Sequence, residues 1–286
     1  MQQFDDIYNK EITKRYHNHE LKRLSARKAV RKREIGAGRP FKLVVRDRCI
    51  ILLVYYRLHI TYTLAGFLFG LDQSNICSRD IQKIEPFVRN CLPVPQKIYN
   101  ITRRLRTPDD VEKYFPAGFL AFIDCTEQQI PRPKNKRKRK AYYSGKKKKY
   151  TVKTQIMVNN HGIILHKTGH RKGRRHDYDI YKEKHPVTPK QVVNVVDLGY
   201  LGIEKDFPEQ ISSLPNRKKR KMQLSQEQNE YNKNHSKRRI VIEHTICRLK
   251  KYRILADMFR NRLKKYNKIS DIVSGLINYG IMHIHH

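Results

Sequence analysis

The chain has 286 residues, and its 62 Lys or Arg against 26 Asp or Glu give a formal net charge of +36. An excess this large repels itself unless a polyanion screens it, so the composition indicates nucleic acid or another anionic surface as the partner. With no apolar run of about 18 residues, a polar N-terminus and five scattered cysteines, we expect no membrane span, secretory signal or disulfide framework. These features favour a cytoplasmic protein, associated with the nucleoid if the host is prokaryotic.

The first 42 residues are polar and basic, with 12 Lys or Arg against five Asp or Glu. They predict a basic arm, helical or loosely ordered, that ends where glycines and Pro40 break the chain. The stretch from Val44 to Tyr56 is strongly apolar and free of Pro and Gly, which predicts a buried helix.

Residues 43–92 predict a helix-turn-helix DNA-binding domain. Thr61 can cap a short helix from Tyr62 to Phe69, and after a turn a further helix runs from Ser74 to about Val88. The second helix of the motif would present five polar side chains to a major groove: Gln73, Ser74, Asn75, Ser78 and Arg79. The alternative is an ordinary small helical bundle, because polar Arg79 and Asp80 occupy positions where the motif usually has an apolar residue.

Residues 93–117 predict a Pro-rich linker and a helix that ends near Tyr114, with Thr107 as a cap before Pro108. From residue 118 to residue 286 the pattern becomes that of an α/β domain. The strands expected there are Phe119–Asp124, Tyr150–Asn159, Ile163–Lys167 and Gln191–Val196. The helices expected are His176–Lys184, Arg238–Met258 and Ile272–Met282, and a polar, basic insertion covers residues 201–237.

Three carboxylates of this second domain could act together. Asp124 and Asp197 each close an apolar strand, and strand ends of an α/β sheet are where ligands bind. Glu243 lies in the long helix that follows. If the three converge, their charges repel unless cations hold them, and Mg²⁺ or Mn²⁺ takes such oxygen ligands. Taken singly, each aspartate could be a turn residue or helix cap, and Glu243 a surface partner of Arg239 one turn earlier.

The order strand–Asp, strand–Asp, helix–Glu resembles that of the DDE transposases. Five local strings, in the correct order, resemble insertion-sequence transposases of the Harbinger-related group. They are Phe122–Glu127 (FIDCTE), Tyr142–Lys147 (YYSGKK) with Lys153–Gln155 (KTQ), Gly173–Asp177 (GRRHD), Val196–Tyr200 (VDLGY) and Arg239–Lys250 (RIVIEHTICRLK). The resemblance runs from about residue 43 to residue 282, which is most of the chain.

This resemblance implies an α/β, ribonuclease-H-like catalytic domain preceded by a small all-α helix-turn-helix domain. It implies that Asp124, Asp197 and Glu243 are catalytic and hold two divalent metal ions, Mg²⁺ or Mn²⁺. Water activated by the ions cleaves a phosphodiester at the element's end, and the freed 3′-hydroxyl attacks target DNA with no covalent protein–DNA intermediate. The implied partners are double-stranded DNA, as terminal inverted repeats and as target, and further copies of the chain in a homodimer or larger assembly. No membrane is involved.

Further DNA contacts are expected from basic residues near these carboxylates. Residues 132–149 hold 11 Lys or Arg and no acid, and Tyr142 and Tyr143 interrupt the run, offering faces to unpaired bases. The expected phosphate contacts are Lys136, Arg137, Lys138, Arg139, Lys146, Lys147, Lys148 and Lys149, with Arg248 and Lys250 on the Glu243 helix. For the run and for both helix residues, a merely solvated face is the alternative.

Three further polar residues keep two interpretations each. His176 and Asp177 lie near accessory positions of the family and could orient substrate, or they could start a helix whose dipole favours Asp177. Glu127 could support a metal indirectly or be a solvated loop carboxylate, and of these we favour the loop carboxylate.

Two other functions fit part of the pattern. One is a transposase-derived DNA-binding protein whose catalytic residues are unused, although the intact triad argues against it. The other is a metal nuclease that only hydrolyses, from which a transposase differs in joining strands. A generic RNA-binding protein fits the charge but leaves the spacing of the three carboxylates unexplained.

Overall fold

The computed structural model describes residues 42–71, 74–218 and 223–284, with six further positions between residues 14 and 25. Apart from those positions and Lys42, the predicted basic arm of residues 1–42 lies outside the described residues. The chain divides into two compact units, one ending at Cys91 and the other starting at Leu92. Among the described residues, no helix combines the length and the apolar character that a membrane crossing needs.

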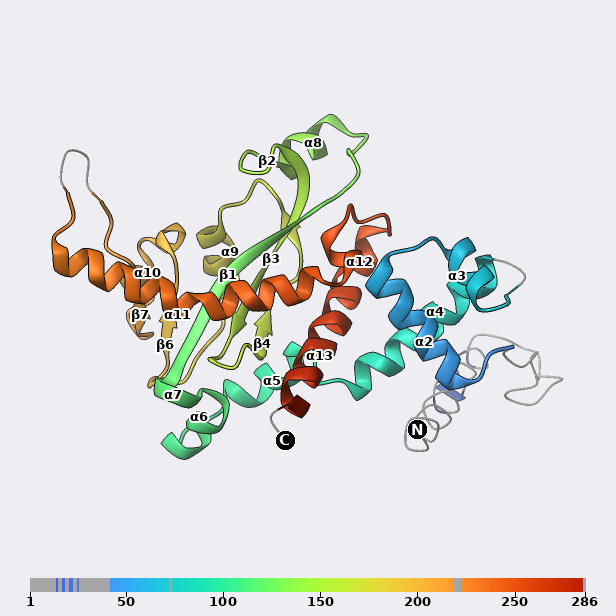
Figure 1. Ribbon diagram of the computed structural model, residues 1–286, viewed down its shortest axis with the longest axis horizontal. Coiled ribbons are helices and arrows are strands. Elements are labelled where there is room, and N and C mark those ends of the chain that lie inside the picture. Colours follow the sequence, from blue (N-terminus) through green and yellow to red (C-terminus); the bar gives the residue numbers. More distant parts are fainter. Residues whose placement is uncertain are drawn as a thin grey trace. The chain divides into compact units, whose positions relative to one another are not determined.

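The described part of the first unit contains the helices α2 (Val45–Leu58), α3 (Tyr62–Leu68) and α4 (Ser74–Cys91), coloured blue to cyan in Figure 1. Thr61 caps α3 as predicted, because its side-chain oxygen accepts a hydrogen bond from the Leu64 N–H at 3.1 Å. Gly70 adopts a φ of 61° in the turn that follows, a conformation that glycine reaches without strain. The described part of the unit therefore contains a helix-turn-helix, formed by the short helix α3, the turn at Gly70 and the longer helix α4.

Asp80 explains why the polar pattern of α4 is compatible with this motif. Its side chain is buried, at 3% exposure, and so is Arg48 of α2, at 1%. Burial raises the pKa of Asp80, and the nearby charge of Arg48 lowers it. A buried cation thus balances the acid that stands at a usually apolar position, whereas Arg79 is exposed.

The second unit is built on a mixed sheet (Figure 1). Its strands are β1 (Leu120–Gln129), β2 (Tyr143–Ser144), β3 (Lys149–Val158), β4 (Ile164–Lys167), β5 (Arg171–Lys172), β6 (Val193–Val195) and β7 (Ser212–Ser213). The strand order is β2-β3-β1-β6-β7, and β4 and β5 also pair with β3. β1 is antiparallel to β3 but parallel to β6, which is parallel to β7. This sheet with its helices confirms the expected α/β, ribonuclease-H-like fold class.

Helices precede the sheet, connect its strands and follow it. They are α5 (Pro95–Thr102), α6 (Pro108–Tyr114), α7 (Pro116–Phe119), α8 (Lys136–Tyr142), α9 (Asp177–Glu183), the 3₁₀ turn η1 (Leu198–Tyr200), α10 (Ile203–Asp206), α11 (Gln226–Lys250), α12 (Arg253–Ala256), η2 (Leu263–Lys265) and α13 (Tyr266–Ile284). Thr107 caps α6 as predicted, accepting a hydrogen bond from the Asp110 N–H. In Figure 1 the long orange helix α11 crosses the sheet.

The two faces of β1 have different partners because successive side chains of a strand point in opposite directions. Asp124 and Gln128 face the α11–α12 side: Asp124 contacts Arg239 of α11, and Gln128 donates to the Ile254 carbonyl of α12. Cys125 faces the other side, where it meets Tyr200 of η1. Each position on β1 is thereby assigned to one layer of helices.

Several predicted boundaries differ from the structure: the long helix ends at Lys250 and not at Met258, the last helix starts at Tyr266 and not at Ile272, and two further differences concern elements of the candidate site. Asp124 does not close its strand, because β1 continues to Gln129; the residues after Asp124 are polar, yet their backbones pair with β3. The long helix starts at Gln226 and not near Arg238, because Ser225 and Gln228 form a reciprocal capping box. About a third of the presumed polar insertion, residues 226–237, is therefore the first part of α11.

Candidate active site

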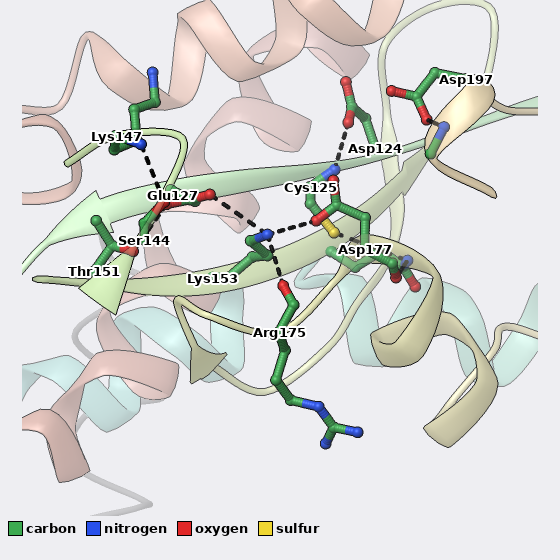
Figure 2. Close-up of polar contacts among 12 residues, drawn as sticks. Asp124, Cys125, Glu127, Ser144, Lys147, Thr151, Lys153, Arg175, Asp177 and Asp197 are labelled. Carbon is green, nitrogen blue, oxygen red and sulfur yellow. Dashed lines mark hydrogen bonds and ion pairs between the residues drawn. The ribbon is translucent and has the colours of Figure 1, made fainter. Parts of the chain in front are cut away.

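Asp124 and Asp197 approach each other from neighbouring parallel strands. Asp124 lies in the middle of β1, and Asp197 comes two residues after the end of β6, where it caps η1 by accepting the Gly199 N–H at 2.8 Å. Asp124 accepts its own hydrogen bond from the Cys125 N–H at 2.7 Å (Figure 2). The parallel register of β1 and β6 brings both carboxylates to one end of the sheet.

The electrostatics of Asp124 show that it lies among other acids. Burial raises its pKa to about 6, and the charges of Asp197 and Asp177 raise it too, while the Cys125 hydrogen bond and Arg239 lower it. Its side chain is 20% exposed, so water screens these charges only in part. Asp124 is thus a carboxylate that a cation would stabilise.

Arg239 supplies the positive charge next to Asp124. Its Nη2 lies 3.2 Å from Asp124 Oδ2, and its side chain is only 14% exposed. The ion pair between Arg239 and Glu243 considered from the sequence does not form, because Arg239 turns to β1 instead. Glu243 is exposed one helical turn further on and forms no hydrogen bond or ion pair with any residue that the structure describes. The structure therefore unites two of the three predicted carboxylates.

A buried polar network supports the segments that carry these acids. The Tyr200 hydroxyl lies 3.6 Å from Cys125 Sγ and accepts a hydrogen bond from Gln155 Nε2 at 2.9 Å. Gln155 also contacts the Asp177 carbonyl at 3.5 Å. Burial raises the pKa of the Cys125 thiol well above its ordinary value, so this cysteine stays protonated. The network joins β1, β3, η1 and the start of α9.

Lys153 of β3 organises a second cluster (Figure 2). Its Nζ lies 2.8 Å from Asp177 Oδ1 and 3.4 Å from Glu127 Oε1, and it donates to the Arg175 carbonyl at 2.8 Å. Burial lowers the pKa of Lys153, but the hydrogen bond and charge of Asp177 and the charge of Glu127 raise it above its ordinary value. Glu127 belongs to β1 and its side chain is 8% exposed, so the interpretation as a solvated loop carboxylate was wrong.

His176 and Asp177 are neighbours in the chain, but only Asp177 belongs to the Lys153 cluster. His176 is exposed and precedes α9 as its N-cap residue without a side-chain cap bond. Asp177 is the first residue of α9, where the helix dipole favours an acid, and it is also bound by Lys153. Both interpretations offered for Asp177 are thus compatible with its position.

The predicted DNA contacts of α4 lie on its first turns. Asn75 and Arg79 are exposed, and Arg79 Nε donates to the Asn75 carbonyl. Ser78 accepts a hydrogen bond from Gln82. Ser74 is the first residue of α4, whereas Gln73 lies outside the described residues.

The basic run forms structure that its composition did not predict. Asn135 caps α8, a helix that carries Lys136, Arg137, Lys138 and Arg139. A turn before β3 carries the lysines Lys146, Lys147, Lys148 and Lys149, of which the last begins the strand. All of these side chains are exposed except Arg139, which is half-buried. They present a strongly cationic surface where β1 ends and β3 begins.

Lys250 does not belong to that surface. Its Nζ donates to the carbonyls of Glu127 and Leu255, each at 2.9 Å, and burial lowers its pKa to about 8. The expectation that Lys250 meets DNA is corrected by this position, since the ammonium group holds β1 and α12 to α11. Arg248, two residues earlier, is exposed.

The donor set at Asp124 and Asp197 fits divalent metal ions. Both residues offer carboxylate oxygens, which Mg²⁺ and Mn²⁺ prefer, and the charge of Asp197 raises the pKa of Asp124 as expected of two acids that need a cation. In the described part of the chain, no group of three His, Cys, Asp or Glu side chains gathers closely enough to hold a metal. Glu243 is accordingly not assembled with the aspartates.

Four residues of the site were not predicted: Arg239, Tyr200, Gln155 and Lys153. Tyr200, Gln155 and Lys153 stand inside strings that resemble the family, so a signal existed, but no spacing rule shows that a side chain is buried against a carboxylate. Arg239 could be placed on the Glu243 helix, but its partner on β1 is more than a hundred positions away.

The sequence of the chain is similar to those of known proteins. A family model described as "DDE superfamily endonuclease" matches residues 123–278, and one described as "Helix-turn-helix of DDE superfamily endonuclease" matches residues 41–93. The chain is 32% identical over 254 residues to the "Probable transposase for insertion sequence element IS702" of Microchaete diplosiphon, covering 88% of this chain and 86% of that protein. No solved structure matches the chain.

Proposed function

The chain belongs to the DDE superfamily of endonucleases, as a transposase with a helix-turn-helix domain, and from this premise we propose what it does. It binds the terminal inverted repeats of its own element, hydrolyses the phosphodiester at each end, and transfers the freed 3′-hydroxyl to target DNA. The observation that carries the proposal is the pairing of Asp124 with Asp197 on parallel strands beneath the helix that bears Glu243.

The residues of the chain divide the work by position. Asp124 and Asp197 present carboxylate oxygens to two divalent ions, and Glu243 is proposed to complete the second ion site when DNA is bound. Bound Mg²⁺ or Mn²⁺ supplies Lewis-acid stabilisation of charge on the phosphodiester oxygens. Arg239 holds Asp124 in place and offsets its charge. The exposed lysines of residues 146–149 hold the DNA backbone beside this centre.

The chemistry proceeds by two displacements at phosphorus. In the first, water attacks, the P–O bond to the 3′ oxygen breaks, and that oxygen leaves as a 3′-hydroxyl. In the second, the 3′-hydroxyl attacks a target phosphodiester, so a new P–O bond forms while one target P–O bond breaks. The number of phosphodiester bonds is conserved in the second step, which therefore needs no external energy source.

A cleavage-and-joining assay tests the proposal. A labelled duplex carrying the repeat that flanks the gene is incubated with Mg²⁺ or Mn²⁺, with and without a chelator, and nicked and joined products are separated. We expect cleavage and joining only with metal, and a loss of several orders of magnitude in Asp124→Asn, Asp197→Asn and Glu243→Gln. Duplex affinity should stay equal or rise, since each change removes a negative charge.

Two variants serve as matched controls. Glu230→Gln removes an exposed acid from the same helix as Glu243, and Asp109→Asn removes one from α6; both should cut normally. Cleavage without joining would show a hydrolytic nuclease. DNA binding without any cutting would show a DNA-binding protein with unused catalytic residues. Normal cutting by Glu243→Gln would remove that residue from the site.

The assembly state follows from the same chemistry. Two element ends must be held together for joint transfer, so we propose a homodimer or larger complex on DNA, in the cytoplasm or nucleoid. Mass photometry with and without the repeat duplex measures it, and a strictly monomeric complex on DNA would contradict the proposal.

A further inference from the structure

A hollow of about 740 Å³ opens on the face of β1 that points away from α11. Its floor is formed by side chains of β1, β3 and the start of α9. Its walls are formed by Arg139 and Lys140 of α8, by residues 143–146 of β2 and the turn after it, and by residues 173–176. Asp124 points to the opposite face of β1, so the hollow is separate from the predicted metal site. The two are joined through Asp177, which lines the hollow and whose charge reaches Asp124.

The floor of the hollow is a closed set of ion pairs. Lys153 binds Glu127, Asp177 and the Arg175 carbonyl, and Thr151 Oγ1 donates to Glu127 Oε2 at 2.8 Å (Figure 2). The side chains of Lys153 and Glu127 are 10% and 8% exposed. Lys153 offsets only one of the two acid charges, so a bound anion must be held by the cations of the walls, and the polar groups of the floor bind mainly one another. The floor is therefore a fixed platform, and its polar groups do not select one ligand by its hydrogen-bond pattern.

The walls carry positive charge and aromatic rings. Cationic wall residues are Arg139, Lys140, Lys146, Arg174 and Arg175. Of these, Lys140, Lys146 and Arg174 form no ion pair with the residues that the structure describes, and Arg139 Nε is buried without a hydrogen-bond partner among them. Tyr143 is 40% exposed, and its ring meets Tyr150 edge-on at a centroid distance of 5.7 Å.

Gly173 shows that this wall is closely fitted to the floor. A Cβ added at Gly173 would lie 2.0 Å from Thr151 Oγ1 and 2.7 Å from the Thr151 carbonyl oxygen, which no side chain could tolerate. Gly173 also donates its N–H to that carbonyl at 3.0 Å. This close approach and the hydrogen bond from Lys153 to the Arg175 carbonyl hold residues 173–175 against β3.

Cations together with exposed aromatic rings are the combination that binds unpaired nucleotides, since the cations bind phosphate and each base stacks on a ring. Bases of a duplex are stacked and paired, so they have no free face to offer Tyr143. A hollow of this volume accepts a ligand of nucleotide size, whereas a duplex cannot enter it.

We propose that this hollow binds an unpaired nucleotide of a DNA strand, with little preference for the identity of the base. The proposal rests on the proposed function in that the ligand is DNA held near Asp124. It assigns Tyr143 as the stacking residue, Lys140, Lys146 and Arg174 as phosphate ligands, and the Lys153 cluster as the platform beneath them.

The first test compares single-stranded and duplex probes of equal length. Fluorescently labelled dT12 and a 12-base-pair duplex are titrated with the full chain at one fixed salt concentration. We expect Tyr143→Ala to weaken dT12 binding by about 5-fold or more, the loss typical of one base–aromatic stack, and to change duplex binding less than twofold. Tyr143→Phe keeps the ring and should bind dT12 as the wild type does.

The control variant is Tyr279→Ala. Tyr279 is 48% exposed on α13 and stacks on His283, so its removal changes an exposed aromatic residue away from the hollow. It should leave binding of both probes unchanged. A U12 probe is included, and a clear preference for U12 over dT12 would overturn the DNA assignment in favour of RNA.

The second test needs no substitution. A dT12 probe with one 5-iododeoxyuridine is photocrosslinked to the wild-type chain, and the adduct is mapped by mass spectrometry. Adducts at Tyr143 or Tyr150 support the proposal, and adducts only elsewhere overturn it even if Tyr143→Ala misfolds. Equal loss of dT12 and duplex binding in Tyr143→Ala would also overturn it.

Different results would overturn the proposed transposition reaction and the proposed nucleotide site. A wild-type chain that cuts and joins element ends, combined with unchanged dT12 binding in Tyr143→Ala, removes only the nucleotide site. A chain that never cuts but crosslinks dT12 through Tyr143 removes only the transposition reaction.

Discussion

At the scale of single residues, Tyr200 connects the segments of the two aspartates through its backbone and its side chain: its N–H donates to the Asp197 carbonyl at 3.1 Å. It is fully buried in the turn that Asp197 caps, and its hydroxyl meets Cys125, the neighbour of Asp124, and Gln155 of β3. The hydroxyl group therefore adds a side-chain link between the Asp197 turn and β1, beside the backbone pairing of β1 with β6. Tyr200 acts as a positioning residue, because residues behind a metal ligand commonly fix its orientation.

Tyr200→Phe keeps the ring and removes the hydroxyl. We expect cleavage of the element end to fall by about 10- to 100-fold and the half-saturating Mn²⁺ concentration to rise, with duplex affinity unchanged. Direct Mn²⁺ binding by electron paramagnetic resonance gives a readout that is independent of activity. Tyr181→Phe is the control: it also loses one buried hydroxyl bond, to Gln210, in the same core cluster. If both variants bind Mn²⁺ alike, Tyr200 has no positioning role.

Lys250 makes stability depend on pH in a way that can be measured. Burial lowers its pKa from 10.5 to about 8 in the folded state, so between these values the unfolded state binds more protons and folding becomes more favourable as pH rises. Lys250→Met removes this titration. From pH 7 to pH 9.5 the free energy of unfolding of the wild type should rise by about 2 kcal/mol relative to Lys250→Met, measured by urea denaturation. Parallel pH profiles would show that Lys250 is not desolvated.

At the scale of elements, the strands were easier to predict than the helix that carries Glu243. The alternation of apolar residues in β3 and the apolar run of β6 are periodic signals, and both strands formed where they were expected. The polar half of β1 has no such signal, since Thr126 and Glu127 are held by pairing with β3. The start of α11 was missed because its first turns are polar and face solvent, and only the Ser225–Gln228 capping box marks it.

The same limit applies to the candidate site. Asp124, Asp197 and Glu243 could be named from their order along the chain, because that order is local information about elements. The contacts of Arg239 with Asp124 and of Lys250 with Glu127 join positions more than a hundred residues apart, and no periodicity encodes them. Sequence therefore predicts which residue types reach the sheet, while packing decides which of them meet.

Helix α13 contains two glycines whose surroundings differ, and they separate packing from helix propensity. A Cβ at Gly275 would lie 2.9 Å from Leu92 Cβ and 3.0 Å from Val94 Cγ1, whereas a Cβ at Gly280 meets no atom of the described residues within 4 Å. Gly275→Ala should destabilise the fold by about 1–3 kcal/mol through overpacking. Gly280→Ala should stabilise it by about 0.5–1 kcal/mol through lower chain entropy. Urea denaturation of both variants measures these changes in the free energy of unfolding. A change of the same sign in both variants would contradict the close packing of α13.

At the scale of the whole molecule, the net charge of +36 is larger than the fold needs and must act through partners. The cations differ in how available they are to bind a partner. Some cations are internal, as Lys153 and Lys250 are, and others pair with acids, as Arg171 and Arg175 do with Glu183. The exposed run before β3 has no such partners among the described residues and lies at the end of the strand that carries Asp124. Binding of the phosphate backbone should therefore depend on this run more than on an equal charge elsewhere.

Salt dependence measures that difference directly. A variant in which Lys146, Lys147, Lys148 and Lys149 are all Gln should bind a 20-base-pair duplex more weakly, and its slope of log K against log salt should flatten by about 2–4, since each lost phosphate contact removes about 0.9. The control replaces four exposed lysines on other parts of the second unit with Gln: Lys113, Lys184, Lys190 and Lys205. It loses the same charge and should change the slope by less than about 1. Equal slopes for the two variants would mean that DNA senses only the net charge of the molecule and that the run before β3 is a solvated face.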